Sequence, residues 1–230
     1  MRLRAELKGV LYLLAHDFQV PIRHLCWSVD LLKVELGTLG SDKVESNLTS
    51  LARNAQKLKT MLDSVVDYLQ IKEPSDTLES ANTREIVKAV CDSLQVSENS
   101  PKVKFVLKDL PILQSDSQFL RETFQQLIEN SLQFSDPSRP LRVEIGATQD
   151  SSNHEWTFFV KDNGLGFNAD QKESAFQLFH KLHLGDKYVG LGVGLSICKK
   201  QVESRGGKIW IETVLNTGTE VYFTVRSVSV

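Results

Sequence analysis

The feature that most constrains the fold of this chain is a sustained apolar heptad pattern in residues 48–69. Its apolar residues recur at alternating steps of three and four, which places them along one stripe of a helix; they are Leu48, Leu51, Ala55, Leu58, Leu62, Val65 and Leu69. Residues 7–36 repeat the pattern less regularly, and residues 37–42, which read GTLGSD, predict a turn between the two helices. An antiparallel hairpin of this kind cannot cover its own apolar stripe, so we predict a homodimeric four-helix bundle.

The sequence pattern changes after this helical region. Residues 72–76 read KEPSD and predict a linker, because proline and its polar neighbours end a helix. Beyond it, amphipathic and alternating patterns predict an α+β arrangement, a two-layer α/β sandwich. The predicted helices are 83–94, with Asn82 as N-cap, 118–132 and 190–203, and the predicted strands are 102–110, 141–148, 156–161, 208–214 and 219–226. The expected domains are therefore a helical hairpin at 1–72 and an α/β domain at 77–230.

The composition excludes several classes of partner. The chain has 230 residues and a formal net charge of −2, without the basic excess that nucleic acid or an anionic membrane would favour. We therefore expect no nucleic-acid partner and no direct membrane contact for this segment. No apolar run approaches the ~18–20 residues that span a bilayer, and no signal peptide is evident. Three scattered cysteines, Cys26, Cys91 and Cys198, argue against a disulfide scaffold and suit a cytoplasmic location.

A histidine on the polar side of the first helix is the first candidate for chemistry. When the apolar residues of 11–18 are placed on the helical seam, His16 falls on the opposite, solvent-facing side. Asp17 can accept a hydrogen bond from one imidazole nitrogen and so make the other more nucleophilic. Pro21 removes a backbone hydrogen bond and bends the helix locally. This segment can attack a phosphoryl group, although taken by itself it is also compatible with an incidental surface histidine.

Three segments of the second region have the character of a nucleotide site. Gln126 and Asn130 lie four residues apart on a predicted helix and so share one face. Asp162 ends a predicted strand, where its carboxylate can accept a hydrogen bond from an exocyclic amine, and the glycines after it let a planar base approach the backbone. Alternate glycines then open the last helix, where N–H groups and the positive dipole end suit phosphate. The glycines of the two segments are Gly164, Gly166, Gly190, Gly192 and Gly194.

Each of these segments has a second interpretation when taken alone. The helix with Asn130 can be an ordinary packing helix. The turn after Asp162 can be a hairpin or a calcium loop, although a calcium loop needs more acidic ligands than Asp162 and Asp170 supply. The alternate glycines suggest a dinucleotide fold, but that fingerprint follows a strand in a βαβ unit, whereas residues 184–189 are polar and lid-like.

In their order along the chain, these segments resemble the sequence boxes of sensor histidine kinases. Residues 15–23, AHDFQVPIR, resemble the H-box, in particular its variant in phytochrome-like kinases. Residues 126–135, 160–167 and 190–198 resemble the N, G1 and G2 boxes, and Phe176 with Phe179 resembles the F-box. The resemblance covers nearly all of the chain. It implies a dimerisation and histidine phosphotransfer hairpin followed by an ATP-binding domain of the GHKL (Bergerat) type.

The resemblance also implies a role for each matched residue, with ATP and Mg²⁺ as cofactors. His16, beside Asp17, would accept the γ-phosphoryl group, Asn130 would hold Mg²⁺ against the phosphates, and Asp162 would select adenine. The other positions expected at the nucleotide are Gln126, Gln133, Gly164, Gly166, Phe179, Gly190, Gly192 and Gly194. The implied partners are a second copy of the chain and a response-regulator receiver domain, whose aspartate would receive the phosphoryl group.

The chain departs from the family pattern at three positions. Gln126 stands where a second asparagine is usual, and Gln133 where a basic residue is usual, so nucleotide affinity is expected to be reduced. Val20 occupies a position where threonine or asparagine orients a water in kinases that also dephosphorylate their partner, so weak or absent phosphatase activity is predicted.

Three other functions compete with the histidine kinase interpretation. Gyrase-type, chaperone and mismatch-repair ATPases share the fold, but they place a glutamate base where this chain has Gln126, which cannot take a proton. A non-catalytic histidine phosphotransfer protein with a degenerate nucleotide domain remains the alternative. A purely structural dimer module would leave Asp162 and the glycines unexplained.

Overall fold

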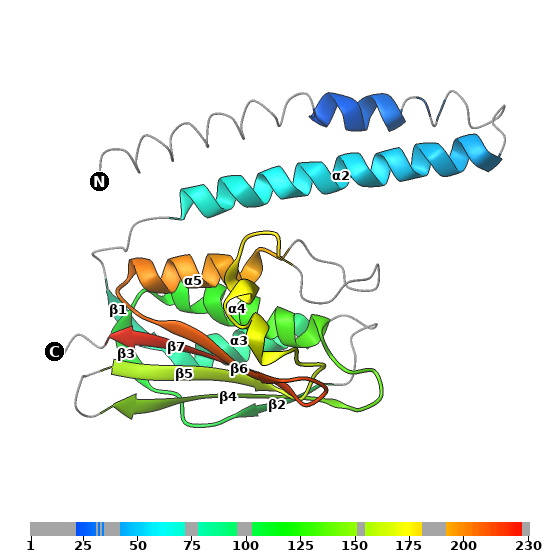
Figure 1. Ribbon diagram of the computed structural model, residues 1–230. Coiled ribbons are helices and arrows are strands. Elements are labelled where there is room, and N and C mark those ends of the chain that lie inside the picture. Colours follow the sequence, from blue (N-terminus) through cyan, green and yellow to red (C-terminus); the bar gives the residue numbers. More distant parts are fainter. Residues whose placement is uncertain are drawn as a thin grey trace. The chain divides into compact units, whose positions relative to one another are not determined.

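The computed structural model describes residues 22–30, 32, 34, 42–71, 78–95, 103–150, 155–180 and 192–226. His16, Asp17, Val20 and Gly190 therefore lie outside the described residues. The chain divides into two compact units, Met1–Ile71 and Lys72–Val230 (Figure 1).

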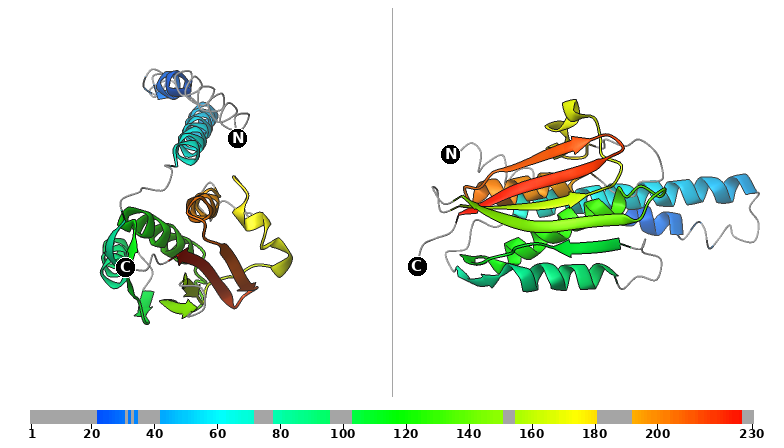
Figure 2. Two further views of the ribbon diagram at one scale, coloured as in Figure 1. Left: turned by 90° about the vertical axis from the view of Figure 1, so that its left-hand side faces the viewer. Right: turned by 90° about the horizontal axis from the view of Figure 1, so that it is seen from below.

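The first unit is helical in its described part, apart from Ile71 at its end. Residues 22–30 form a helix that lies beside the long helix α2 (Asp42–Gln70) in Figures 1 and 2. On α2, Leu48 and Ala55 are buried, with exposed fractions of 8% and 7%, whereas Leu51 and Leu58 are 50% and 51% exposed. Part of the predicted apolar seam is thus left uncovered within one chain. None of the described helices is both long and apolar enough to cross a membrane.

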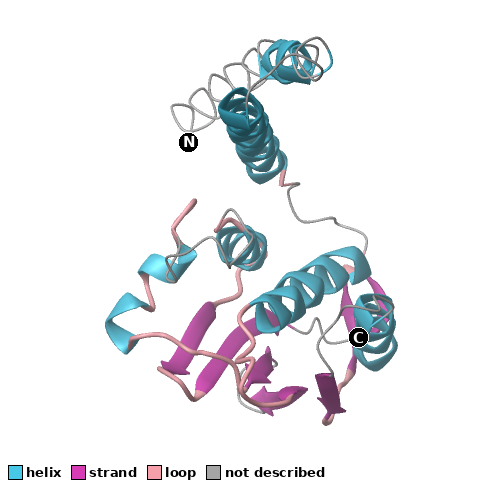
Figure 3. Cartoon of the chain, turned by 90° about the vertical axis from the view of Figure 1, so that its right-hand side faces the viewer, coloured by secondary structure: helices cyan, strands magenta, loops and turns pink. Residues whose placement is uncertain are grey.

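The second unit is built on a five-stranded mixed sheet with the strand order β2-β4-β5-β7-β6. Its strands are β2 (Val103–Leu107), β4 (Leu141–Asp150), β5 (Glu155–Asp162), β6 (Ile209–Val214) and β7 (Gly218–Arg226). Strand β2 runs parallel to β4, and the other neighbours pair antiparallel. Helices α3 (Thr83–Gln95), α4 (Ser117–Gln133) and α5 (Gly194–Ser204) cover one face of the sheet, as Figures 2 and 3 show.

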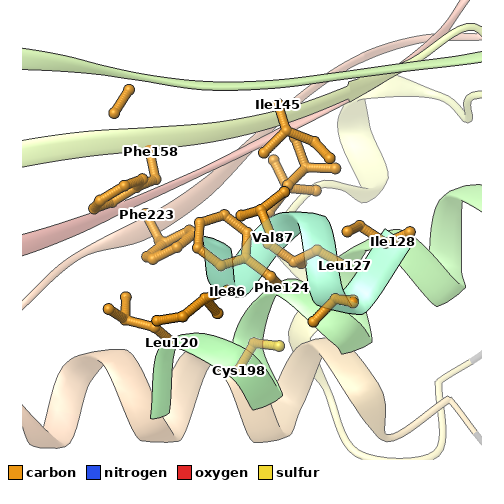
Figure 4. Close-up of a cluster of buried hydrophobic side chains, with 14 of the residues drawn as sticks. Ile86, Val87, Leu120, Phe124, Leu127, Ile128, Ile145, Phe158, Cys198 and Phe223 are labelled. Carbon is orange, nitrogen blue, oxygen red and sulfur yellow. The ribbon is translucent and has the colours of Figure 1, made fainter. Parts of the chain in front are cut away.

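The core between the sheet and the helices is centred on three phenylalanines (Figure 4). Phe124 of α4 meets Phe158 of β5 and Phe223 of β7 edge-on, with ring centroids 5.6 Å and 5.4 Å apart, and the two strand rings stack at 5.2 Å. Aromatic contacts of these geometries stabilise a core beyond the burial of their area. Because the three rings fix α4 over the middle of the sheet, they also fix the polar residues farther along α4 near the ends of β5 and β7.

Most of the predicted elements of the second unit are confirmed. The helices predicted at 83–94 and 118–132 match α3 and α4 within one residue at each end, and the Asn82 side chain accepts a 3.4 Å hydrogen bond from the amide of Glu85. The strands predicted at 141–148, 156–161, 208–214 and 219–226 are β4 to β7, with ends shifted by at most two residues.

Three details of the prediction are wrong or incomplete. The strand predicted to reach residue 110 ends at Leu107, four residues before Pro111, which cannot donate to a strand ladder and suits the connection that follows. The helix predicted to open at residue 190 begins at Gly194, because Gly192 adopts a φ of +70°, which no helix can continue. A small antiparallel sheet of β1 (Glu79–Asn82) and β3 (Ile112–Ser115) was not predicted.

Candidate nucleotide site

Asp162, the last residue of β5, has its carboxylate held by donors from three parts of the unit. Its Oδ1 accepts hydrogen bonds from the amides of Gly164 at 2.8 Å and Thr219 at 3.2 Å, and its Oδ2 accepts one from the Ser131 hydroxyl at 3.1 Å. Burial raises the pKa of Asp162, while these three donors and the charge of Arg139 act in the opposite direction. The result is a half-buried acceptor whose orientation is set before any ligand arrives.

The turn that follows Asp162 has no room for side chains at its two glycines. A Cβ on Gly164 would lie 2.5 Å from the carbonyl oxygen of Phe134, at the end of α4. A Cβ on Gly166 would lie 2.1 Å from the carbonyl oxygen of Val214, and Gly166 has a φ of +56° that favours glycine. The turn is therefore wedged between the end of α4 and the turn that joins β6 to β7.

Arg139 ties these neighbouring segments together. One guanidinium nitrogen, Nη2, donates to the carbonyl oxygens of Gly164 and Asn216, each at 2.8 Å. Its Nε lies 3.4 Å from Asp136 Oδ2, a charge contact rather than a hydrogen bond. Leu165 adds two backbone bonds, donating to Phe134 O at 2.9 Å and accepting from the amide of Asn216 at 2.6 Å. The turn after Asp162 is thus held from both sides.

The polar face of α4 meets the start of α5. A Cβ on Gly194 would lie 2.6 Å from Gln126 Oε1 and 3.7 Å from Asn130 Nδ2, so both carboxamides point toward the N-terminus of α5. Among the described residues, Asn130 Nδ2 is buried and has no hydrogen-bond partner. Val193, the N-cap of α5, gives that terminus no side-chain cap. An unpaired buried amide beside uncapped helix N–H groups is costly without a ligand, and the pair suits phosphate oxygens.

A backbone hydrogen bond joins the residues on either side of segment 181–191, and these flanking residues form its base. The amide of Phe179 donates to Gly192 O at 3.0 Å, and Phe179 itself has a φ of 62°. A Cβ on Gly192 would lie 2.4 Å from the carbonyl oxygen of His180, so only glycine fits there. From α5, the Lys199 ammonium lies 5.3 Å from the centre of the Phe176 ring, a cation–π contact that packs this base against the helix.

The structure thus brings most of the sequence-predicted positions together in two linked groups. Asp162, Gly164 and Gly166 form one group, and Gln126, Asn130 and Gly194 form the other; α4 joins them. Phe179 and Gly192 lie at the base of the segment that precedes α5. Gln133, the last residue of α4, is half buried. Gly190 and the pair His16 and Asp17 lie outside the described residues.

Three residues that hold this site were not predicted from the sequence. Ser131 lies next to Asn130 in the predicted helix, so its place on the same stretch of α4 was the available signal. Thr219 reaches Asp162 only because β5 and β7 pair with Lys161 opposite Glu220. Arg139 comes from the connection after α4 and has no sequence pattern that marks it.

The residues present fit a magnesium ion that arrives with a nucleotide. The described residues contain no group of three or more His, Cys, Asp or Glu that could hold a metal ion by themselves. Gln126 does offer a neutral carboxamide oxygen beside the N-terminus of α5, and Asn130 carries a second carboxamide on the same face of α4. Mg²⁺ takes oxygen ligands and commonly receives most of them from substrate phosphates and water.

The fold and the site together define an ATP-binding α/β domain of the GHKL type. Residues 115–229 match the model of the family "Histidine kinase-, DNA gyrase B-, and HSP90-like ATPase", and the chain belongs to this family. Cyanobacterial phytochrome B of Nostoc sp. (strain PCC 7120) is 31% identical over 230 residues, which are 99% of this chain and 30% of that protein. The methanogenesis regulatory histidine kinase FilI of Methanothrix harundinacea is 28% identical over 96% of this chain and 25% of its own length.

A solved structure extends the likeness in fold. The crystal structure of full-length ShkA in complex with AMPPNP aligns with a TM-score of 0.69 over 96% of this chain and 46% of that chain, at 19% identity. The chain spans between a quarter and a third of the length of the two relatives named above, 30% and 25%. The resemblance to sensor histidine kinases inferred from the sequence boxes is confirmed.

Proposed function

We propose that this chain is the catalytic core of a protein histidine kinase, which binds Mg-ATP in its second unit and phosphorylates His16 in its first. The observation that carries the proposal is the arrangement around α4. Along this helix, the amide of Asn130, which has no hydrogen-bond partner among the described residues, faces the N-terminus of α5, and the next residue, Ser131, contacts the half-buried carboxylate of Asp162. A phosphate subsite on α4 and an amine acceptor on β5, joined through Ser131, suit a purine nucleotide.

The binding roles follow from the contacts of each residue. Asp162 Oδ2 accepts a hydrogen bond from the exocyclic amine of adenine, and the turn at Gly164 and Gly166 lets the base approach the backbone. The N–H groups at the start of α5 and the carboxamides of Asn130 and Gln126 bind the phosphates. Bound Mg²⁺ supplies charge that stabilises the transferring phosphoryl group.

The transfer step takes place at His16. A neutral imidazole nitrogen attacks the γ-phosphorus in line, a P–N bond forms, the bond to the β-phosphate oxygen breaks, and ADP leaves. Asp17 accepts a hydrogen bond from the other ring nitrogen and so keeps the attacking nitrogen unprotonated. The product is a phosphohistidine that is labile in acid and stable in base.

The proposal extends to partners and place. Two chains pair through residues 1–72 in a four-helix bundle, where the half-exposed Leu51 and Leu58 would be covered by the second copy. The phosphoryl group passes from His16 to an aspartate of a response-regulator receiver domain. This segment works in the cytoplasm, where ATP is available.

Labelling with γ-phosphate-labelled ATP and Mg²⁺ tests the proposal. Wild-type chain should incorporate acid-labile, base-stable label, and both His16→Gln and Asp162→Asn should lose it. Asp170→Asn is the matched control, since Asp170 is an exposed carboxylate away from the described contacts of the site and its variant should label normally. Label that persists in His16→Gln would show that another residue accepts phosphate and would refute the assignment.

The alternative function is a phosphotransfer protein that passes phosphate between regulators through His16 without using ATP. Two features favour it: Gln126 and Gln133 bring no charge to the nucleotide phosphates. Calorimetry with Mg-ADP separates the two functions, because the kinase must bind the nucleotide and the relay need not. No binding, together with His16-dependent uptake of label from a phosphorylated regulator, would establish the relay.

Val20 leads to a prediction about the reverse reaction. A valine side chain cannot orient a water by hydrogen bonding, so the chain should have little phosphatase activity toward its phosphorylated regulator. The measurement is the half-life of the phosphorylated regulator with and without this chain, in the absence of nucleotide. A half-life shortened severalfold by wild-type chain would contradict the prediction.

A further inference from the structure

Ser131 lies in the last turn of α4, where its hydroxyl is directed toward the end of a strand. Its side chain is buried, with 4% of its surface exposed. The hydroxyl lies 3.2 Å from the carbonyl oxygen of Leu127, one turn back on α4, and 3.1 Å from Asp162 Oδ2, which ends a strand. The second contact joins α4 to the sheet at the residue proposed to bind the nucleotide base.

The hydrogen bonds of the Asp162 carboxylate are divided unequally between its oxygens. Oδ1 accepts from two backbone amides, those of Gly164 and Thr219, and so has both of its lone pairs in use. Oδ2 accepts only from Ser131 among the described residues. The remaining acceptor position therefore lies on Oδ2, and a ligand amine must bind there.

The two amides alone do not fix the position of Oδ2. The torsion about the Cβ–Cγ bond is broad and moves both oxygens together, and the two hydrogen bonds to Oδ1, one of them 3.2 Å long, tolerate part of this rotation. Ser131 is anchored on a helix whose place is set by the core contacts of Phe124. It thus supplies a second fixed point, from a different element, and that point sets the plane of the carboxylate.

We propose that Ser131 is a specificity-determining positioning residue, which holds Oδ2 of Asp162 in the orientation that accepts the exocyclic amine of a 6-aminopurine. The inference rests on the proposed binding of ATP and deepens it. In this arrangement α4 contributes to recognition at both ends of the nucleotide, through Asn130 at the phosphates and through Ser131 at the base.

The test compares two ligands on each of two proteins. Calorimetry of the full chain measures the affinity of Mg-ADP and of the magnesium complex of purine riboside diphosphate, in which hydrogen replaces the 6-amine. In Ser131→Ala, the affinity for ADP should fall about five- to tenfold, the range expected for one hydrogen bond. The affinity for the analogue should change less than about twofold, because it never uses the amine contact.

The ratio of the two affinities separates positioning from a structural role. A general weakening of the site would lower both affinities equally and leave the ratio unchanged, and a partly unfolded sample would also leave it unchanged. Thr123→Val is the matched control, since it removes another buried hydroxyl from α4 that has no hydrogen bond in the described structure. Its ratio should equal that of wild type.

A second variant keeps the test independent of the alanine substitution. Ser131→Cys preserves the size of the side chain with a weaker donor, so its ratio should fall between those of wild type and Ser131→Ala. Wild-type ratios in both Ser131 variants would overturn the inference while leaving ATP binding intact. If wild-type chain binds neither ligand, the proposed function itself fails, and this inference fails with it.

Discussion

Asp162 is a residue at which binding and stability are in conflict. Its pKa is raised chiefly by burial, so the folded chain binds a proton at this carboxyl more tightly than the unfolded chain does. By linkage, the contribution of this group to folding is greatest at low pH and decreases as the pH rises through its folded pKa. At neutral pH the ionised carboxylate therefore lowers the stability of the second unit.

Replacing Asp162 with Asn should show this conflict directly. Asparagine can keep the bonds from Gly164 and Thr219 through its oxygen, and its amide can donate to Ser131, so the hydrogen bonding survives without the buried charge. We expect the free energy of unfolding to rise by about 1 kcal/mol at pH 7, because a neutral amide costs less to bury than an ionised carboxylate, while Mg-ADP binding is lost. Thermal denaturation of wild type and variant at pH 7.5 and pH 5 measures the difference in stability.

The difference in stability should shrink at the lower pH, where more of the wild-type carboxyl is protonated. Asp170→Asn, an exposed carboxylate, should change neither stability nor binding. A lower melting temperature for Asp162→Asn at neutral pH would mean that the three hydrogen bonds outweigh the cost of burial.

Whether a site residue could be predicted depended on how locally its role is encoded. Asp162, Gly164 and Gly166 form one short run at a strand end, so a sequence pattern marks them. Thr219 of β7 contacts Asp162 of the neighbouring strand β5. The position of Thr219 follows from the register between these two strands, which the alternation of apolar and polar residues does not specify. Arg139 donates to two backbone carbonyl oxygens, and the side chains of those two residues give no sequence signal for such a contact.

At the scale of elements, the placement of α4 depends on Asp116. As N-cap, Asp116 accepts hydrogen bonds through Oδ1 from the amides of Gln118 at 3.0 Å and Phe119 at 3.1 Å. Its Oδ2 lies 2.8 Å from Arg205 Nη2, at the C-terminal end of α5. Burial acts to raise the pKa of Asp116, but the Phe119 amide and Arg205 outweigh it, and the pKa is lowered. One carboxylate thus caps one helix and ties it to another.

Substitutions at Asp116 should separate the cap from the ion pair. Asp116→Ala removes both and should lower the free energy of unfolding by about 2 kcal/mol, the upper end for the loss of a cap. Asp116→Asn keeps a good N-cap and should lose less than half as much. Because the pKa is lowered in the folded state, the stabilisation is present above the ordinary pKa of aspartate and is lost as the pH falls through the folded value.

Urea denaturation of the wild type and both variants at neutral pH measures these effects. If Asp116→Asn proves as destabilising as Asp116→Ala, the pairing with Arg205 matters more than the cap. The cap would then not be what positions α4.

Elements with strong periodicity were predicted, and those defined by pairing were not. The helix α4 and the strands β4 to β7 have apolar faces long enough to show a period. The strands β1 and β3 have only four residues each, ESAN and ILQS. They form because they pair with one another, although α3 and β2 separate them in the sequence. The start of α5 was placed too early, because glycines that suit a phosphate loop do not reveal which of them takes a positive φ.

At the scale of the whole molecule, the two units present different surfaces. The second unit has its apolar core enclosed between the sheet and three helices, whereas α2 of the first unit leaves large apolar side chains open to solvent. Leu51 and Leu58 are seven residues apart and lie on one stripe, the spacing at which a facing helix packs. A second copy of the chain is the proposed cover for this stripe.

Lysine substitutions on this stripe should weaken the dimer. The double variant Leu51→Lys with Leu58→Lys removes four leucines from a twofold interface and places charges there. Burying a leucine fully contributes about 1.5–3 kcal/mol, and each 1.4 kcal/mol changes a dissociation constant about tenfold. The dimer dissociation constant should therefore rise at least about a hundredfold. Asn47→Lys with Asn54→Lys is the matched control: both positions are exposed on α2, also seven apart, and the added charge is the same. Sedimentation equilibrium over a range of concentrations measures the mass of each variant. Equal dissociation constants for the two pairs would mean that the exposed leucines do not form the dimer contact, and a wild-type chain that stays monomeric would remove the four-helix bundle from the proposal.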